Sequence, residues 1–593
     1  MNTKHTCRRQ GGCFQGKMAS GNRSKSYTAH QIGAFIALLV LAIWGLAVLW
    51  VHMVAPAGAD MFAMTYLGTL TLMFLILLPL YWTRVRWAYI GGIFMVVAMY
   101  AGTAKAALDQ DLVFSWSLYN MVTILVYAIA LACAYFSVRS YRELASLGTK
   151  KTILGIGSIV VATAIVAAVL WANRGLVRRT MWQWTLNRID NRLQNLETLD
   201  ERIQFLVDEG DLSSATLGIV VNDSLVWAQA YGEADLDTLY DIGSVTKPFV
   251  ATAVLQLYER GLIDLDEDVN EYLPLNLRHP EYPDTPITIR MLLTHQSGLA
   301  HFSDQYMGYH MGKETIDWMS ENRGWHLPRY DPPPPFVEFL EGYVTPAGAY
   351  YTPGVWIAAR PGTEYSYSTP GYDILAYLVE SVSGQPFSEY AQDNIFTPLG
   401  MISSGFSVTD FPDRVALPYE RVYGVLSKIN AQLPLSDART IGGGGMLSTV
   451  PDLAQFIIAH LNQGQVDGAQ LLEPETVALM QEKAVSFPLG HADLNQVSYS
   501  LGLGHIRDKP WSAWGHLYDM HGATGHGGSW FGYQGQMWFV EEEEGGYGMV
   551  LLVNTEFDFK AEARDLWLFA SPLKLQVLLM EEAAVMYQQE RSN

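Results

Sequence analysis

The chain has 593 residues, with 38 Lys and Arg, 59 Asp and Glu, and three cysteines. Its charge is divided unevenly: residues 1–173 hold 13 basic and 4 acidic residues, and the rest of the chain holds 25 basic and 55 acidic residues. A surface this acidic repels nucleic-acid phosphates, so we expect no nucleic-acid partner. Cys7, Cys13 and Cys133 all lie in the first part, which excludes disulfides and cysteine-ligated metals from the acidic part.

Five uncharged apolar runs dominate the first part. They span about 32–51, 62–82, 87–104, 113–136 and 153–172, and each is close to the ~20 residues that a helix needs to cross a bilayer. The connections are alternately rich and poor in Lys and Arg, beginning with six in the first 30 residues, which indicates a cytoplasmic N-terminus. The sequence therefore predicts a basic cytoplasmic tail (1–30), an all-α transmembrane domain of five helices (31–173) and a multi-pass location in the cell membrane. The acidic part is then extracytoplasmic.

The acidic part begins with a helical pattern and continues as a mixture of strands and helices. Residues 174–210 have apolar positions at three- and four-residue spacing, which predicts a connecting amphipathic helix. A hairpin is predicted around Asn222, Asp223 and Ser224, and a second one around the four glutamates at 541–544. Strands near both ends with helices between them predict one α/β domain, residues 211–593, built on a single sheet.

The segment DIGSVTKPFVATAVLQLYERG (241–261) places Ser244 and Lys247 three residues apart. Pro248 locates the start of a helix, because proline fits only its first turn. The helix dipole and free N–H groups there favour an oxyanion, and a lysine with a lowered pKa can act as the base of a serine nucleophile. The motif alone is weak, since Ser244 is equally well interpreted as a helix cap and Lys247 as a solvated side chain.

Four further segments follow in order: RMLLTHQSGL (290–299), RPGTEYSYSTPGYDILAYLVESVSG (360–384), GGGGMLSTVPDLAQF (442–456) and TGHGGSWFGYQGQM (524–537). With the Ser–Lys pair, they resemble the serine β-lactamase-related family of class C β-lactamases, D-Ala-D-Ala carboxypeptidases, D-aminopeptidases and esterases. The resemblance covers residues 200–560 approximately. It implies an α/β sandwich, with an antiparallel sheet flanked by helices, plus a helical subdomain, and a site between them. From its position, the loop-rich insertion at about 302–355 is expected to overhang that site.

The resemblance gives the first motifs their catalytic roles. Ser244 becomes the acylated nucleophile and Lys247 its proton acceptor. Tyr367 stands at the tyrosine of the family's Y-x-N motif and becomes the second acid and base. Thr369 stands where the family has asparagine, whose amide meets the acylamino group of the substrate. Threonine offers only a hydroxyl, so esters or unusual amides are favoured over β-lactams and peptides.

The last segment supplies the other side of the site. His526, Gly527 and Gly528 match the family's K-T-G or H-x-G motif, in which His526 orients the substrate and supports the charge of the site. The two glycines let the strand backbone approach the substrate. By the same resemblance, the backbone N–H groups of Ser244 and Ser529 form the oxyanion hole.

Several other features have simpler interpretations. His516, His521 and His526 are five residues apart, which fits no common zinc pattern, and the family needs neither metal nor cofactor, so we expect none. The four glycines at 442–445 lack a following G-K-[S/T] and are interpreted as a flexible turn beside the cleft. His295 and Ser297 belong to a structural turn in this family.

These observations together predict a membrane-anchored, extracytoplasmic serine hydrolase that forms an acyl-enzyme with an ester or amide. Its substrate is a small molecule or a peptide, for which the cell wall is one source. Three alternatives remain open. One is a D-Ala-D-Ala carboxypeptidase or β-lactamase that acts on peptidoglycan or β-lactams. Another is a sensor that a penicillin or a wall fragment acylates without turnover. The third is an inactive binding module.

Overall fold

The computed structural model describes residues 188–592 apart from 302, 424–427, 434–440, 489–495, 507–519, 521 and 557–569, together with residues 32 and 34–36. From residue 188 onward, the described residues belong to one compact unit.

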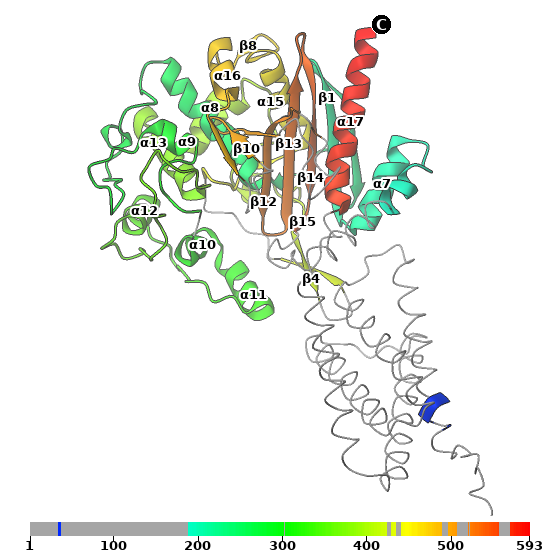
Figure 1. Cartoon of the computed structure of the whole chain (residues 1–593), viewed down its shortest axis with the longest axis horizontal. Helices are drawn as coiled ribbons and strands as arrows, with labels where there is room; N and C mark the ends of the chain where they lie inside the picture. The colour runs from blue at the N-terminus through cyan, green and yellow to red at the C-terminus, as the bar shows by residue number, and fades with distance from the viewer. Residues whose placement is uncertain are drawn as a thin grey trace, which may run out of the picture. The chain divides into compact units, whose positions relative to one another are not determined.

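An eight-stranded antiparallel sheet forms the centre of this unit (Figure 1). From one edge to the other, its strands are β2 (Ser224–Gly232), β1 (Ser214–Val221), β14 (Gly546–Val553), β13 (Tyr533–Glu541), β12 (Thr524–Trp530), β11 (Gly504–His505), β10 (Gln496–Tyr499) and β9 (Val485–Pro488). β1 and β14 are neighbours, with Ala215 opposite Val553. Segments far apart in the chain therefore share one sheet, as the sequence predicts. Both predicted hairpins, β1–β2 and β13–β14, are confirmed as well.

Helices and short strands pack around this sheet. The helices are α7 (Leu199–Gly210), α8 (Thr246–Glu259), α9 (Ile289–Leu293), α10 (Asp304–His310), α11 (Lys313–Arg323), α12 (Phe336–Val344), α13 (Thr369–Ser383), α14 (Phe387–Ala391), α15 (Val450–Leu461), α16 (Pro474–Gln481) and α17 (Ala570–Ser592). Single helical turns occur at η2 (Gly243–Val245), η3 (Val269–Glu271), η4 (Gln392–Phe396) and η5 (Val408–Asp410). The remaining strands are β3 (Tyr240–Asp241), β4 (Tyr419–Tyr423), β5 (Lys428–Gln432), β6 (Leu447–Ser448), β7 (Gln465–Val466), β8 (Ala469–Gln470) and β15 (Thr555–Glu556).

The central strands are covered on both faces. Successive side chains of a strand point to opposite faces, so a strand buried on both sides is apolar without alternation. All eight residues of β1 are buried. Leu217, Ile219 and Val221 lie in one apolar cluster with α7 and α17, whereas Val220 lies in a second cluster with α8 and α15. The expected antiparallel sheet flanked by helices is thereby confirmed (Figure 1).

The predicted connecting helix, residues 174–210, is described by the structure from residue 188 onward. It is helical at 188–193 and again in α7. Thr198 accepts a hydrogen bond from the backbone N–H of Glu201, and the Glu201 side chain bonds back to the Thr198 backbone. This capping box starts a new helix at Leu199. Residues 174–187 lie outside the described part.

The predicted transmembrane domain needs correction. No helix among the described residues combines the length and the apolar composition that crossing a bilayer requires. The longest of the helices given above, α17, has 23 residues, but Lys574, Glu581 and Glu582 interrupt its apolar positions. The five apolar runs expected to span the membrane lie outside the described residues, except for residues 32 and 34–36. The structure therefore supports neither the predicted five-helix transmembrane domain nor the predicted multi-pass location in the cell membrane.

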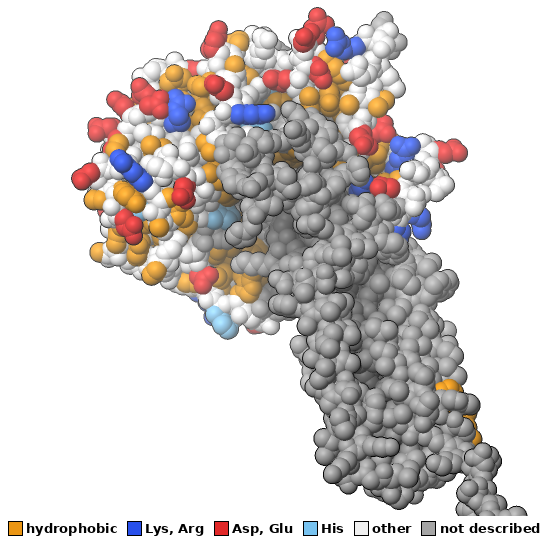
Figure 2. All heavy atoms as spheres, viewed as in Figure 1, with side chains coloured by type: hydrophobic (Ala, Val, Ile, Leu, Met, Phe, Trp, Pro, Cys, Tyr) orange, Lys and Arg blue, Asp and Glu red, His pale blue; other side chains and the backbone are white. Residues whose placement is uncertain are grey.

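The surface of the described part agrees with its acidic composition. Acidic side chains stand at many places on the face that Figure 2 shows. At the tip of the β13–β14 hairpin, Glu541, Glu542, Glu543 and Glu544 are exposed. They form the solvated hairpin tip that the sequence predicts.

Candidate active site

Ser244 lies where the chain turns from a strand into a helix. β3 ends at Asp241, Ser244 occupies the single turn η2, and α8 starts at Thr246 with Pro248 in its first turn. The Asp241 carboxylate accepts the Gly243 N–H at 2.8 Å, and Gly243 has a left-handed backbone with φ of 51°. A residue with a Cβ adopts this conformation less readily. The expected position of Ser244 next to the start of a helix is confirmed.

Lys247 meets Ser244 inside the protein. Its side chain is fully buried, and Nζ lies 2.9 Å from Ser244 Oγ and bonds to the carbonyl oxygen of Gly443. Burial disfavours the ammonium form and lowers the pKa of Lys247 from 10.5 to about 7, although the negative charge of Asp373 partly opposes this shift. A lysine with this pKa is partly uncharged at neutral pH and can accept a proton from the adjacent hydroxyl.

Tyr367 completes the polar group around Ser244. Its ring centroid lies 5.1 Å from Lys247 Nζ, and its phenol is hydrogen-bonded to Ser244. Burial raises the pKa of Tyr367 well above 10, and the hydrogen bond to Ser244 only partly offsets this. The environment thus moves the two pKa values in opposite directions, down for Lys247 and up for Tyr367. Such a separation is typical of a base and an acid that work together.

His526 comes from β12 and is neutral near pH 7. Burial and the nearby Lys247 lower the pKa of His526 to about 3. Its Nδ1 lies 2.6 Å from the carbonyl oxygen of Gly527, which can only accept, so Nδ1 carries the proton. Nε2 then accepts the hydroxyl proton of Tyr499 at 3.0 Å. His526 is therefore held in one orientation as a neutral imidazole, and its predicted role in orienting the substrate stays a prediction.

The glycines of β12 allow this strand to touch the Ser244 turn. A Cβ added at Gly528 would lie 1.9 Å from the carbonyl oxygen of Ile242 and 2.9 Å from the backbone nitrogen of Ser244. One added at Gly243 would lie 2.7 Å from the backbone nitrogen of Ser529. The backbone N–H groups of Ser244 and Ser529 therefore belong to two segments in direct contact. An oxyanion hole needs two donors close together, so this contact is compatible with the predicted role of the two N–H groups.

Thr369 has a histidine partner that the sequence does not reveal. Thr369 is the first residue of α13, and its hydroxyl lies 3.1 Å from Nδ1 of His301. The exposed His301 ring lies 5.0 Å from the Tyr367 ring. Desolvation by the surrounding protein and the positive charge of Lys247 lower the pKa of His301 below 6.5. The imidazole is therefore neutral at pH 7. His301 follows the RMLLTHQSGL segment by two residues, and no pattern marks it as a site residue.

His295 and Ser297 form a structural turn, as expected. His295 has a left-handed backbone with φ of 57°. Its Nδ1 accepts the Ser368 N–H at 3.0 Å, and its ring lies 4.3 Å from the Tyr367 ring and 4.7 Å from the Tyr499 ring. The turn therefore fixes the segment that carries Tyr367, and it does not supply a Ser–His dyad.

The four glycines at 442–445 are buried and not the flexible turn that the sequence predicts. The Asp373 carboxylate accepts the N–H groups of Gly442 and Gly443 at 3.1 and 2.7 Å. These bonds hold the turn against α13, where the Gly443 carbonyl bonds to Lys247. Asp373 is thus a second residue near the site that the sequence does not reveal.

The insertion at 302–355 forms α10, α11 and α12. Met307, Met311 and Met319 of this insertion form an apolar cluster in which Trp530 and Phe531 also pack. Trp530 directly follows Ser529 at the end of β12. The insertion therefore packs against the chain beside the expected oxyanion hole.

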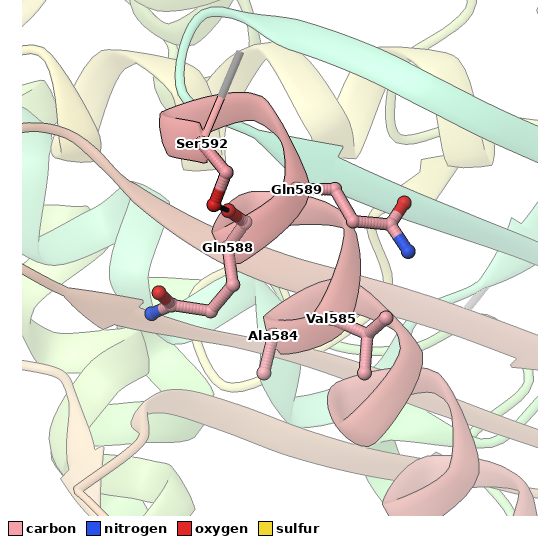
Figure 3. Close-up of a pocket in the computed structure, with 5 residues that line it drawn as sticks. All are labelled: Ala584, Val585, Gln588, Gln589 and Ser592. Atoms are coloured by element: carbon pink, nitrogen blue, oxygen red, sulfur yellow. Dashed lines mark hydrogen bonds between the residues drawn. The ribbon is translucent and has the colours of Figure 1, made fainter.

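A separate surface pocket lies on α17 (Figure 3). It is lined by Ala584, Val585, Gln588, Gln589 and Ser592. None of these side chains is an acid or a base at neutral pH, so this pocket offers no group for proton transfer. Of the three histidines considered for zinc, His516 and His521 lie outside the described residues.

Comparison with known proteins agrees with this geometry. The family model described as Beta-lactamase matches residues 199–571. Esterase EstB of Burkholderia gladioli is 27% identical over 392 residues, which are 61% of this chain and 90% of that protein. The D-alanyl-D-alanine-carboxypeptidase/endopeptidase AmpH of Escherichia coli is 24% identical over 306 residues, which are 49% of this chain and 69% of that protein.

Among solved structures, the octameric penicillin-binding protein homologue from Pyrococcus abyssi is 25% identical, with a TM-score of 0.48. The similarity covers 64% of this chain and 76% of that chain. The family match spans more than half of the present chain and includes all the motif residues described above. The chain therefore belongs to the beta-lactamase family of serine hydrolases.

Proposed function

We propose that the chain hydrolyses its substrate through an acyl-enzyme, with Ser244 as the nucleophile and Lys247 as the base. The observation that carries this proposal is the 2.9 Å separation of Lys247 Nζ and Ser244 Oγ. The amine is fully buried there, and its pKa is lowered to about 7. The uncharged amine takes the hydroxyl proton while Oγ attacks the carbonyl carbon of the substrate.

The neighbouring groups have roles that follow from their protonation states. The Tyr367 phenol is protonated at neutral pH and gives its proton to the leaving group as the ester or amide bond breaks. Lys247 then returns the proton that it took from Ser244 to the phenolate. In the second step, a water molecule loses a proton to the same pair and attacks the acyl-enzyme, which frees Ser244. The N–H groups of Ser244 and Ser529 stabilise the oxyanion in both steps.

An ester is the substrate class that we favour. Thr369 replaces the asparagine that would offer an amide group to a peptide-like substrate, and its hydroxyl is engaged with His301. The similarity to Esterase EstB over 90% of that protein supports the same choice. The second candidate is a carboxypeptidase that acts on a peptide, for which the similarity to AmpH is the supporting observation.

The test is a pre-steady-state measurement on the purified full-length chain with an activated p-nitrophenyl ester. We expect a burst of one nitrophenolate per active site followed by turnover, with both lost in Ser244→Ala. A burst without turnover would support the alternative of a sensor that is acylated and stays acylated. Equal rates for wild type and Ser244→Ala would rule out Ser244 as the nucleophile for this ester. Release of D-Ala from a D-Ala-D-Ala peptide, again absent in the variant, would favour the carboxypeptidase.

A further inference from the structure

Asp373 is a fully buried carboxylate to which the proposed reaction gives no role. It lies on α13, four residues after Thr369. A buried carboxylate is unfavourable unless donors surround it. Oδ1 accepts the N–H groups of Gly442 and Gly443 at 3.1 and 2.7 Å, and Oδ2 accepts the hydroxyl of Tyr306 at 2.6 Å.

The second oxygen is held by the insertion. Besides Tyr306, Nε2 of the fully buried His310 lies 3.3 Å from Oδ2. Both residues belong to α10, which is part of the insertion at 302–355. One carboxylate on α13 is therefore contacted by two other segments of the chain, the insertion and the glycine turn.

The glycine turn connects Asp373 to the base. Gly443 gives its N–H to Asp373 and its carbonyl oxygen to Lys247 Nζ. The N–H and the C=O of Gly443 belong to adjacent peptide units that meet at its Cα, so fixing the first unit limits where the second carbonyl can lie through only two dihedral angles, φ and ψ. The carboxylate also acts through its charge, because a nearby anion favours the ammonium form of Lys247 and opposes the effect of burial.

We propose that Asp373 is a positioning residue: it anchors the backbone of Gly442 and Gly443, whose carbonyl holds the Lys247 amine beside Ser244. This inference rests on the proposed serine hydrolase reaction. Tyr306 in turn donates a hydrogen bond to Asp373 and His310 packs beside it, so the insertion contributes to the geometry of the base from a distance.

The other titratable groups that face Lys247 come from several elements. They are Tyr367, Tyr372, His295, His301, His526 and, within the same aromatic cluster, Tyr365 and Tyr499. The pKa values of the tyrosines are raised and those of the three histidines are lowered, so these groups are all neutral near pH 7. Asp373 supplies the charge contribution that raises the pKa of Lys247.

The test replaces Asp373 by asparagine in the purified full-length chain. Asparagine weakens the anchor of the glycine turn, because a neutral amide oxygen is a poorer acceptor than a carboxylate, and it also removes the negative charge. The pKa of Lys247 is read from the pH dependence of its acetylation by acetic anhydride, followed by peptide mass spectrometry. Acetylation needs the uncharged amine, so this reading does not depend on turnover. We expect the midpoint in Asp373→Asn to move down by about one pH unit, the size of effect that a nearby unit charge produces in a protein.

Two controls separate positioning from general loss of structure. Asp452 is also a buried carboxylate, but it bonds to Ser403 and Ser404 and not to the glycine turn. Asp452→Asn should leave the Lys247 midpoint unchanged even if it lowers the melting temperature. Tyr306→Phe removes a hydrogen bond to Asp373 but keeps the charge, so its midpoint should change far less than that of Asp373→Asn.

The same variants are then assayed with the p-nitrophenyl ester. We expect the acidic limb of kcat/KM for Asp373→Asn to move in parallel with the acetylation midpoint. An unchanged midpoint in Asp373→Asn, or an equal change in Asp452→Asn, would overturn the proposal. A wild-type chain without a Ser244-dependent burst would instead overturn the proposed function, while the acetylation midpoint still reports on Asp373.

Discussion

Replacing Gly528 with alanine tests the contact between β12 and the Ser244 turn. A Cβ at this position would lie 1.9 Å from the carbonyl oxygen of Ile242. Carbon and oxygen atoms in proteins approach to about 3.3 Å, so the two backbones have to separate by about 1.4 Å. Neither atom belongs to a flexible side chain, and the shift therefore moves Ser529 away from Ser244. Losing one oxyanion donor lowers kcat by a factor of about 100 to 1,000, and a 1 Å displacement has a similar effect.

Gly527→Ala is the matched control in the same strand. A Cβ there would lie 2.8 Å from Oε1 of Gln536, which is the end of a flexible side chain and can move aside. The assay measures burst amplitude and turnover with the p-nitrophenyl ester for both variants, and the melting temperature confirms that each is folded. We expect a loss of about 100-fold or more in Gly528→Ala and less than 10-fold in Gly527→Ala. Full activity in folded Gly528→Ala, or equal losses in both variants, would refute the contact as the origin of the oxyanion hole.

Three further predictions concern the acid and the base. Because the pKa of Lys247 is lowered to about 7, kcat/KM should rise with pH through about 7; a rate independent of pH between 5 and 9 would exclude Lys247 as the base. Lys247→Met should raise the melting temperature more at pH 7 than at pH 10. The folded pKa lies below the usual 10.5, so protonation favours the unfolded chain, and stability falls as the pH drops from 10.5 to 7. Tyr367→Phe should lower kcat by a factor of about 100 to 10,000 through loss of the acid. If this variant cleaved an ester with a poor leaving group at the wild-type rate, the role of Tyr367 as the acid would be contradicted.

The sequence predicts the parts of the fold that depend on local patterns. The turn residues Asn222 and Asp223 and the β-rich runs on both sides of them identify the first hairpin, and Pro248 identifies the start of α8. The pairing of β1 with β14 also follows, since strands near both ends of an α/β domain need partners. Ser244, Lys247, Tyr367 and His526 lie together as the order of the motifs implies.

The residues that the sequence does not reveal act through tertiary contacts. Asp373 stands in GYDILAYL, where an acidic residue in a helix is most simply exposed to solvent. Its burial becomes apparent only once Tyr306 and the glycine turn pack against α13. The neutral state of His526 depends on tertiary contacts in the same way, because burial and the nearby Lys247 lower its pKa. The membrane prediction rested on the length of five uncharged apolar runs and on the Lys and Arg between them, and no described helix supports it.

The pairing of β1 with β14 has a consequence for synthesis of the protein. β12, β13 and β14 all follow residue 523, and β14 separates β1 from the rest of the sheet. On the ribosome, Ser244 and the following helix α8 emerge some 280 residues before His526. Contacts between such distant segments form slowly, because a long loop has to close first. If Ser244 and Lys247 react as proposed, a nascent chain carries them without His526, and we expect it to stay inert until the last hairpin is inserted. A release assay on ribosome-bound chains of increasing length should show activity appearing in one step, after residue 553 has left the exit tunnel.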